Sequence, residues 1–252
     1  MHTDPPSRAY AIIGGSGLRS LSGLAVEAKH SLKTPYGTTS GPIDSGLIDG
    51  RRVFFIARHG AGHTISPHLI NYRANIWALR EAGAKKLVSV ATVGGIQSRF
   101  APGMLVVPDQ IIDYTWGRAD TFFGVGSPVK HVDFTNPFSM QLRTALLKSA
   151  SSCNLALADG GVYAATQGPR LESAAEINRI ERDGGNVVGM TGMPEAVLAR
   201  ELELEYAMIA VVVNSAAGRA ESAQGIRFEQ LAAIVEESMV RVETILKELI
   251  TR

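Results

Sequence analysis

Short apolar runs that alternate with amphipathic segments are the feature that most constrains the fold of this chain. The runs have the length and composition of buried strands: 9–13, 52–57, 86–91, 104–107, 187–190 and 206–213. Segments with apolar residues at helical spacing lie between several of them. Strands that alternate with helices favour a mostly parallel, mixed central sheet flanked by helices. The sequence therefore predicts a single α/β domain over residues 1–252.

Local signals predict where several helices and turns begin. Ser66-Pro67 and Asn136-Pro137 each have the form of an N-cap followed by proline at the first helical position. The stretch SAAE at 173–176 has the capping-box pattern, and a last amphipathic helix is expected at about 228–250. Asp49-Gly50 predicts a tight hairpin turn between two strands.

Composition and charge exclude several function classes. Lys plus Arg number 25 and Asp plus Glu number 24, and no basic run or aromatic-basic stripe suits a nucleic acid partner. No apolar run reaches the ~18 residues of a membrane span, so no membrane partner is expected. The lone Cys153 excludes an internal disulfide framework and a cysteine-based zinc site. The first fifteen residues lack a secretory pattern, so a cytoplasmic location is expected.

Polar or glycine-rich residues follow five of the predicted strands, where parallel sheets bind their ligands. GGSG at 14–17 offers unobstructed backbone N–H groups and the Ser16 hydroxyl. Arg58 offers a cationic fork, and Thr191 offers another hydroxyl. The remaining strand ends deliver Thr92–Gly95 and Asn214. Together these groups predict an oxyanion site for a small ligand at one edge of the sheet.

Two familiar motifs are only partly matched at residues 14–20. The spacing Gly15-x-Gly17-x-x-Ser20 lacks the third glycine of the dinucleotide fingerprint, and Lys33 stands where that motif expects an acidic residue. Gly14-x-Ser16 begins like a nucleophile elbow, but Leu18 replaces its closing glycine. Neither dinucleotide binding nor a serine hydrolase is therefore favoured.

Several candidate residues have ordinary structural explanations. His59 and His63 are four residues apart, but the glycines between them make the segment a loop, so no metal site is expected. His63 and His131 are also consistent with solvent-exposed histidines. Asn214 is consistent with an amide that bonds its own backbone at a strand end, and Glu172 with an exposed residue near a helix start.

Several motifs in order along almost the whole chain carry a resemblance to a known family: GGSGL at 14–18, TPYG at 34–37, ARHG at 57–60 with His63, NYRANIWAL at 71–79, GPRLES at 168–173 and GMTGMPE at 189–195. In these motifs the chain resembles the trimeric purine nucleoside phosphorylases and methylthioadenosine phosphorylases. Its variants are similar to those of the bacterial members that act on methylthioinosine. The resemblance implies the nucleoside phosphorylase fold.

The resemblance implies cleavage of an N-glycosidic bond by inorganic phosphate, a co-substrate, with no cofactor and no metal. The implied phosphate ligands are Ser16, Arg58, His59, Thr92 and Thr191. The implied nucleoside-binding residues are Leu171, Glu172, Met190, Asn214, Ala216, His131, His63, Ile226 and Phe228. Asn214, Glu172 and His59 are the implied catalytic residues. Ala91 departs from the family, because relatives carry Thr or Asn there.

The resemblance also implies a 6-oxopurine base. Asn214 matches the position whose amide donates to the purine, and Glu172 matches the carboxylate that accepts from N1–H. That carboxylate lies just outside the Ser173 cap, where the helix dipole favours negative charge. Methylthioadenosine phosphorylases carry Asp at the position of Asn214 and a second Asp where this chain has Ala216.

Further matches to the family predict the 5′ substituent of the nucleoside and the oligomeric state of the protein. No histidine occurs in 214–252, and Ile226 and Phe228 occupy the region where relatives contact a 5′-hydroxyl, which favours a 5′-methylthio group. His131, in HVDFTNPF, matches a residue that reaches a neighbouring active site, which implies a homotrimer with shared sites. A methylthioadenosine phosphorylase, a general inosine and guanosine phosphorylase, and a non-catalytic nucleoside sensor remain open alternatives.

Overall fold

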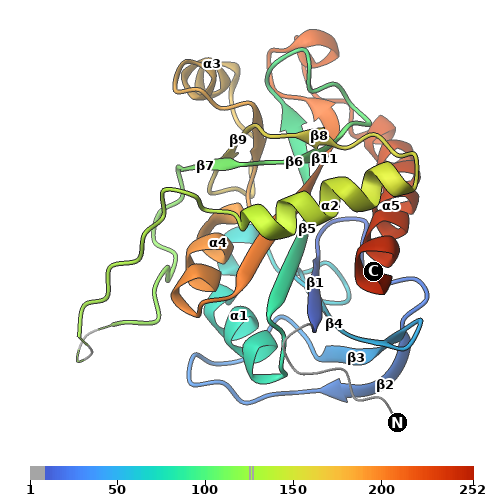
Figure 1. The fold of residues 1–252 in the computed structure, drawn as a ribbon. Helices are drawn as coiled ribbons and strands as arrows, with labels where there is room; N and C mark the ends of the chain where they lie inside the picture. The colour runs from blue at the N-terminus through green and yellow to red at the C-terminus, as the bar shows by residue number, and fades with distance from the viewer. Residues whose placement is uncertain (1–8, 125, 127) are drawn as a thin grey trace.

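The computed structural model describes residues 9–124, 126 and 128–252, which form a central sheet between helices (Figure 1). The strands are β1 (Tyr10–Gly14), β2 (Ala25–His30), β3 (Ile43–Ile48), β4 (Arg51–Ala57), β5 (Lys86–Gly95), β6 (Leu105–Val107), β7 (Gln110–Asp113), β8 (Ala158–Asp159), β9 (Val162–Ala165), β10 (Val187–Gly189) and β11 (Glu205–Ser215). The helices are α1 (Tyr72–Glu81), α2 (Met140–Ser152), α3 (Ala174–Arg182), α4 (Gly192–Glu201) and α5 (Phe228–Thr251), with short 3₁₀ turns at Pro67–Leu69 and Ala220–Ser222.

The order of the strands opens a gap in the middle of the sheet. The main path is β2-β3-β4-β1-β5-β10-β9-β7, and β11 pairs in parallel with β5 from Lys86 to Gly95. Because β11 occupies one edge of β5 over that length, β1 and β10 share the other edge. β1 pairs in parallel with residues 86–89, and β10 pairs antiparallel with Gly94 and Gly95. On this edge, residues 90–93 of β5 lie between the two pairings and have no strand partner among the described residues.

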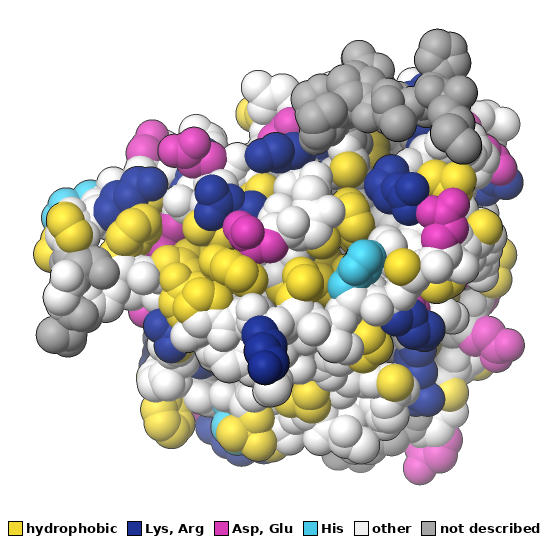
Figure 2. All heavy atoms as spheres, turned by 90° about the horizontal axis from the view of Figure 1, so that it is seen from below, with side chains coloured by type: hydrophobic (Ala, Val, Ile, Leu, Met, Phe, Trp, Pro, Cys, Tyr) yellow, Lys and Arg dark blue, Asp and Glu magenta, His cyan; other side chains and the backbone are white. Residues whose placement is uncertain are grey.

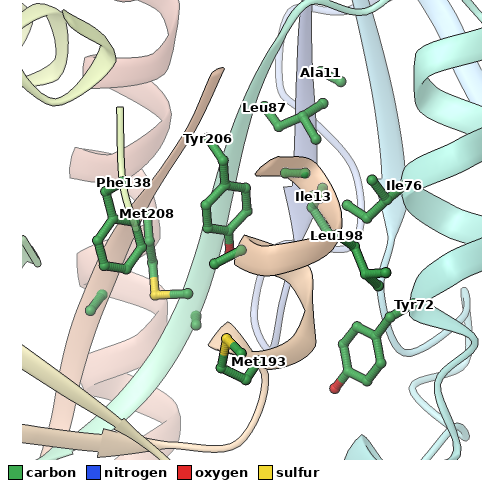
Figure 3. Packing of buried hydrophobic residues seen from close by; sticks show 14 of the residues in the cluster. Ala11, Ile13, Tyr72, Ile76, Leu87, Phe138, Met193, Leu198, Tyr206 and Met208 are labelled. Carbon is green, nitrogen blue, oxygen red and sulfur yellow. The ribbon is translucent and has the colours of Figure 1, made fainter. Parts of the chain in front are cut away.

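Two helical layers cover the sheet, and alternate residues of each strand face different layers. Ala11 and Ile13 of β1 belong to the core formed with α1 and α4, whereas Ile12 belongs to the core formed with α2 and α5. Figure 3 shows Ile76 and Leu198 beside Ile13 in the first of these cores. Strands buried on both faces read as continuous apolar runs. The predicted α/β fold with a mostly parallel, mixed sheet is confirmed.

Each predicted strand is present, but two are longer than predicted. β5 continues to Gly95 and β11 to Ser215, so Thr92 and Asn214 lie within strands and do not follow them. A bulge between Val212 and Asn214 lets the pairing continue, with Asn214 opposite Gly94. The expectation that β11 ends before Asn214 is therefore wrong. Asparagine by itself favours turns, but pairing with the neighbouring strand β5 keeps Asn214 in an extended conformation.

Predictions of the local boundaries had mixed outcomes. The capping box of Ser173 and Glu176 is present, and Asp49 and Gly50 both have positive φ in a two-residue hairpin loop, as a type I′ turn requires. Ser66-Pro67 begins only the short 3₁₀ turn Pro67–Leu69, with Ser66 as N-cap but no side-chain cap bond, and the helix start predicted at Asn136-Pro137 is wrong. α1 begins after Asn71, whose side chain accepts from Ala74 N, and α2 begins after Ser139.

Tertiary contacts explain the later start of α1. Asn71 donates from Nδ2 to the carbonyl of Tyr36 at 2.7 Å, and Asn75 exchanges two hydrogen bonds with Ser40. These bonds hold the loop before β3 against the first turn of α1. Among the described residues, no helix is long and apolar enough to cross a membrane.

Candidate active site

A cavity of about 1130 Å³ lies where β1, β4, β5 and β11 end. β10 reaches the same cavity although it runs antiparallel to β5, because it pairs with the last residues of that strand. The cavity collects most of the residues singled out in the sequence: Ser16, Arg58, His59, His63, Thr92, Leu171, Glu172, Met190, Thr191, Asn214, Ala216 and Ile226. The predicted convergence of the strand ends on one site is therefore present.

Two of the predicted residues are not among those that line the cavity. His131 is exposed and belongs to the segment 114–139 between β7 and α2, part of which projects from the body of the molecule (Figure 1). Phe228 is the first residue of α5, and its side chain lies outside the described part of the structure. The predicted contact of His131 with a neighbouring subunit stays a prediction.

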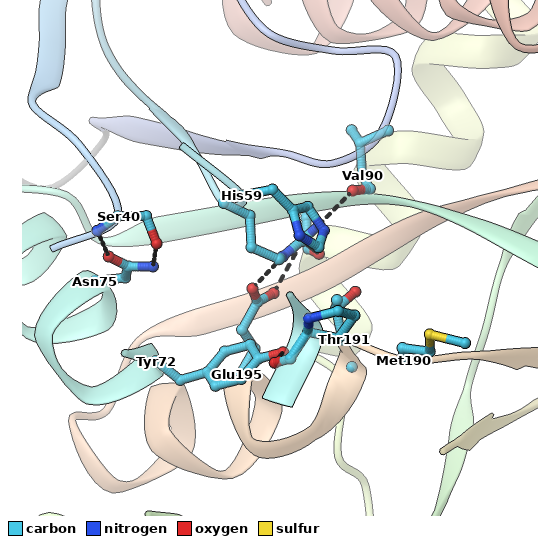
Figure 4. A network of polar contacts seen from close by, with 12 residues as sticks. Ser40, His59, Tyr72, Asn75, Val90, Met190, Thr191 and Glu195 are labelled. Carbon is cyan, nitrogen blue, oxygen red and sulfur yellow. Dashed lines mark hydrogen bonds and ion pairs between the residues drawn. The ribbon is translucent and has the colours of Figure 1, made fainter. Parts of the chain in front are cut away.

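Arg58 forms a buried ion pair at the floor of the cavity. Its side chain is fully buried and donates from Nε and Nη2 to the two carboxylate oxygens of Glu195, at 2.5 and 3.1 Å. Nη2 also donates to Ser89 Oγ at 2.5 Å, and Nη1 donates to the carbonyl of Val90 at 2.9 Å (Figure 4). Burial by itself lowers the pKa of Arg58, but the Glu195 carboxylate more than offsets this and holds that pKa above its ordinary value.

This ion pair changes the expected role of Arg58. A guanidinium has five N–H hydrogens, and four of those of Arg58 are donated to protein groups. Within the described residues, one Nη1 hydrogen is therefore left for a ligand. The cationic fork predicted to face an anion instead faces Glu195. A phosphate contact through Nη1 stays a prediction, and the positive charge of Arg58 lies beneath the cavity in either case.

Gly15 allows the GGSG loop to enter the gap between β1 and β10. A Cβ atom on Gly15 would lie 2.4 Å from the carbonyl oxygen of Val90 and 2.8 Å from Arg58 Nη1. Both distances are too short for a side chain at this position. The glycine therefore brings backbone N–H groups and Ser16 close to the unpaired edge of β5.

His59 is a neutral imidazole with a defined tautomer. It is 8% exposed, and its Nδ1 lies 2.8 Å from the carbonyl of Ile65, which can only accept a hydrogen bond. Nδ1 therefore donates, and Nε2 is left as an acceptor. Desolvation, helped by the charges of Arg58 and His63, lowers the pKa of His59 to about 4. The ring of His63 lies 4.5 Å from that of His59, and desolvation lowers its pKa as well.

The other end of the cavity carries an amide and a carboxylate. Glu172 Oε1 accepts from Thr166 Oγ1 at 2.6 Å, which orients the carboxylate. Asn214 donates from Nδ2 to the carbonyl of Ser215 at 2.7 Å. That bond to its own backbone is the ordinary role considered for this residue. It leaves Oδ1 and the second Nδ2 hydrogen for a ligand, and the small Ala216 leaves space beside them.

The loops between β9 and α3 and between β10 and α4 meet at Met190. Gly168 has a φ of 61°, and a Cβ atom there would lie 2.4 Å from Met190 Sδ. Thr191 is the N-cap of α4, but its side chain makes no cap hydrogen bond, and the residue lines the cavity. The backbone of α4 becomes regular only after Pro194, which places Glu195 at the first regular turn.

Some functional residues were missed in the sequence. Glu195 lies within a quoted motif, and its only signal was a carboxylate in an otherwise apolar stretch. Leu231, Val235 and Met239 of α5 form an apolar side of the cavity. The apolar stripe in the sequence predicts a buried helix face, but it does not show that these side chains face a cavity. Among the described residues, no group of three His, Cys, Asp or Glu side chains could hold a metal ion.

Comparison with known proteins identifies the relatives of the chain. The Phosphorylase superfamily matches residues 9–251. A probable S-methyl-5′-thioinosine phosphorylase of Xanthomonas campestris pv. campestris is 49% identical over 96% of this chain and 97% of its own. The 6-oxopurine nucleoside phosphorylase of Pyrococcus furiosus is 47% identical over 82% of this chain and 80% of its own. The structure of methylthioadenosine phosphorylase from Schistosoma mansoni with adenine is similar at a TM-score of 0.92, with 29% identity, covering 97% of this chain and 91% of that one.

Breaking the buried ion pair should cost far more stability than breaking an exposed one. Glu195→Gln leaves the buried guanidinium without its counter-charge, and we expect a loss of about 3–5 kcal/mol in the free energy of unfolding, measured with urea. The matched control is Glu27→Gln, which breaks the exposed Arg52–Glu27 pair and should cost about 0–1 kcal/mol. Equal losses in the two variants would contradict the structural role of Glu195.

The low pKa of His59 should make the fold sensitive to acid. Between the ordinary histidine pKa of 6.5 and about 4, the unfolded chain binds a proton at His59 that the folded chain does not. Stability should therefore fall as pH drops through this window, by about 2–3 kcal/mol between pH 7 and pH 4.5 from this group. His59→Gln should lose less stability over the same interval, as urea titrations at both pH values would show. A fall as steep in His59→Gln as in wild type would refute the assignment.

Proposed function

The chain belongs to the phosphorylase superfamily, and on that premise we propose that it cleaves S-methyl-5′-thioinosine with inorganic phosphate. The products are hypoxanthine and 5-methylthioribose 1-phosphate. The observation that carries this proposal is that Glu172 and Asn214 line the same cavity as His59, Thr191 and Ser16 of the GGSG loop. The relatives named as methylthioinosine phosphorylases support it.

The phosphate site is proposed at the gap beside β5. Backbone N–H groups of the GGSG loop, the Ser16 and Thr191 hydroxyls and the charge of Arg58 favour an anion there. The neutral His59 offers Nε2 as an acceptor for a protonated phosphate oxygen. Held under the ribose and shielded from water, a phosphate oxygen attacks C1′ as the bond to the purine breaks. The bonding electrons leave with the base.

The base site is proposed at Glu172 and Asn214. As the C1′–N9 bond breaks, negative charge develops on the purine, and donors aimed at N7 or O6 stabilise it. Asn214 can supply the second Nδ2 hydrogen, or both hydrogens when its side chain turns away from Ser215. Glu172, oriented by Thr166, accepts from N1–H of a 6-oxopurine. Adenine presents a lone pair at N1 and an amino group at C6, which reverses both contacts.

The 5′ substituent is proposed to meet the apolar side of the cavity. Ile226, Leu231 and Val235 line that side, and residues 214–252 contain no histidine for a 5′-hydroxyl. Burying a methyl group and a sulfur atom is worth about 1–2 kcal/mol at ~25 cal/mol per Å². A preference for the methylthio group over a hydroxyl is therefore expected, and inosine should remain a poorer substrate.

A homotrimer with shared active sites is proposed on the basis of the segment 114–139. Part of the segment projects from the body of the molecule, and the segment carries the exposed His131. In the view from below, hydrophobic side chains gather beside the projecting segment (Figure 2). Such a surface suits contact with a second copy of the chain. No resident cofactor enters the proposal, because the chemistry needs only the nucleoside and inorganic phosphate.

A substrate panel with and without phosphate tests the proposed activity and its base preference. Two mismatched contacts at ~1–3 kcal/mol each amount to at least about 30-fold in kcat/KM for methylthioinosine over methylthioadenosine. Inosine, guanosine and adenosine complete the panel, and release of base should require phosphate. Asn214→Asp should narrow the gap, because a protonated Asp can donate to adenine N7 while its other oxygen accepts from the amino group. Equal use of the two methylthio nucleosides would refute the role of Asn214, and phosphate-independent binding without cleavage would indicate a sensor.

The proposed shared site predicts a selective effect of His131. His131→Ala should raise the KM for methylthioinosine by roughly 3- to 10-fold, as for one lost hydrogen bond, and change the KM for phosphate by less than about twofold. His30→Ala, on the edge strand β2, is the control and should change neither value. Light scattering of the wild-type enzyme should give a trimer. A catalytically competent monomer would contradict the shared site.

A further inference from the structure

Arg118 joins two separate loops of the candidate site from outside the cavity. It lies in the segment 114–139 and is not among the residues that line the cavity. Its guanidinium donates at 2.6–3.2 Å to the carbonyls of Met190, Met193, Thr166 and Gln167, to the hydroxyl of Tyr72 and to the side-chain oxygen of Gln167. The planar fork of arginine suits this arrangement, because several donors are presented in fixed directions.

The four carbonyls belong to the two loops that carry opposite ends of the proposed site. Thr166 and Gln167 begin the loop that leads to Glu172, and the Thr166 hydroxyl is the group that orients this carboxylate. Met190 and Met193 flank Thr191 in the loop that leads into α4. Nη1 bonds the second loop and Nη2 bonds the first. A single guanidinium therefore spans the distance between them.

Other contacts hold the backbone near Arg118 in place. Glu201, which is 5% exposed at the end of α4, accepts from Thr121 Oγ1 at 2.6 Å and from Phe122 N at 2.7 Å. Trp116 N donates to the side-chain oxygen of Gln167 at 3.2 Å. Arg118 is thus fixed on both sides along the chain, as a group that sets the geometry of other groups must be.

We propose that Arg118 is a positioning residue, which holds the base-side loop 166–172 and the sugar-side loop 190–193 at the separation that catalysis requires. It acts through main-chain carbonyls and does not touch the substrate. The names of the two loops rest on the proposed function. Arg118 and His131 belong to the same segment. The position of that segment therefore also sets the geometry of the active site in the same chain, through Arg118.

Arg118→Met keeps most of the side-chain volume and removes the donors to both loops. Displacement of either loop by about 1 Å costs on the order of 100-fold in rate, so we expect kcat for the preferred nucleoside to fall by roughly 10- to 100-fold. The KM for phosphate should rise as well, by up to about tenfold, because Thr191 lies on the loop 190–193 while Ser16 and His59 lie on other loops. Arg118→Lys keeps the charge but cannot bond both loops, and it should recover only part of kcat.

The matched control is Arg143→Met. Arg143 is 7% exposed and donates to the carbonyls of Pro108 and Val107 at 2.9 and 3.3 Å, and none of these residues lines the cavity. This variant loses these two main-chain bonds and an ion pair with Asp159, and it should lower the Tm. Its kcat should stay within about twofold of wild type, because a merely structural loss does not move the site.

Amide hydrogen exchange gives a readout that does not depend on the substrate. In Arg118→Met, exchange should rise together in 166–172 and 190–193, while β5 stays protected. In Arg143→Met the rise should appear near 105–113 instead. Unchanged exchange in either loop of Arg118→Met, or a kcat within about twofold of wild type, would overturn the proposal. If the wild-type enzyme prefers another nucleoside, the proposed substrate fails while the exchange result still decides the role of Arg118.

Discussion

The buried pair of Arg58 and Glu195 is the interaction on which the rest of the site depends. It joins the end of β4 to the first regular turn of α4, and through Ser89 and Val90 it also ties both to β5. Tyr206 of β11 donates to the same carboxylate at 3.0 Å. Four elements therefore meet at one desolvated charge pair, and its partners satisfy the polar groups that burial would otherwise leave unpaired. The pair is neutral overall, and its cationic end, Arg58, is the one that lines the cavity.

The topology of the sheet explains why a cavity forms above that pair. β1 and β10 share one edge of β5, and on that edge its middle residues have no strand partner among the described residues. Gly15 lets the GGSG loop approach the Val90 carbonyl at that edge, where a side chain would collide. Ligands of α/β sheets bind where neighbouring strands diverge. Here the divergence lies along one strand, because β10 runs against the direction of β5.

Several polar groups of the site are held by the protein itself. Asn214 bonds the carbonyl of Ser215, Glu172 is oriented by Thr166, and His59 bonds Ile65. Such bonds select a rotamer or a tautomer, and they leave a defined second atom for a ligand. Arg118 extends the same principle from side chains to whole loops. The proposed enzyme thus relies on an outer layer of hydrogen bonds to set the direction of its ligand-binding atoms.

The sequence by itself determined the α/β fold, the strands that read as apolar runs, the Asp49-Gly50 turn and the Ser173 capping box, because these depend on neighbours within a few residues. Most of the site residues that it named through short motifs and a family resemblance line the cavity. Only the tertiary structure decided that Arg58 faces Glu195, that β11 continues past Asn214, and that α1 begins after Asn71 and not after Ser66. The physical reason is that each outcome depends on groups far apart in the chain, and a local pattern carries no information about which distant partner satisfies a buried polar group.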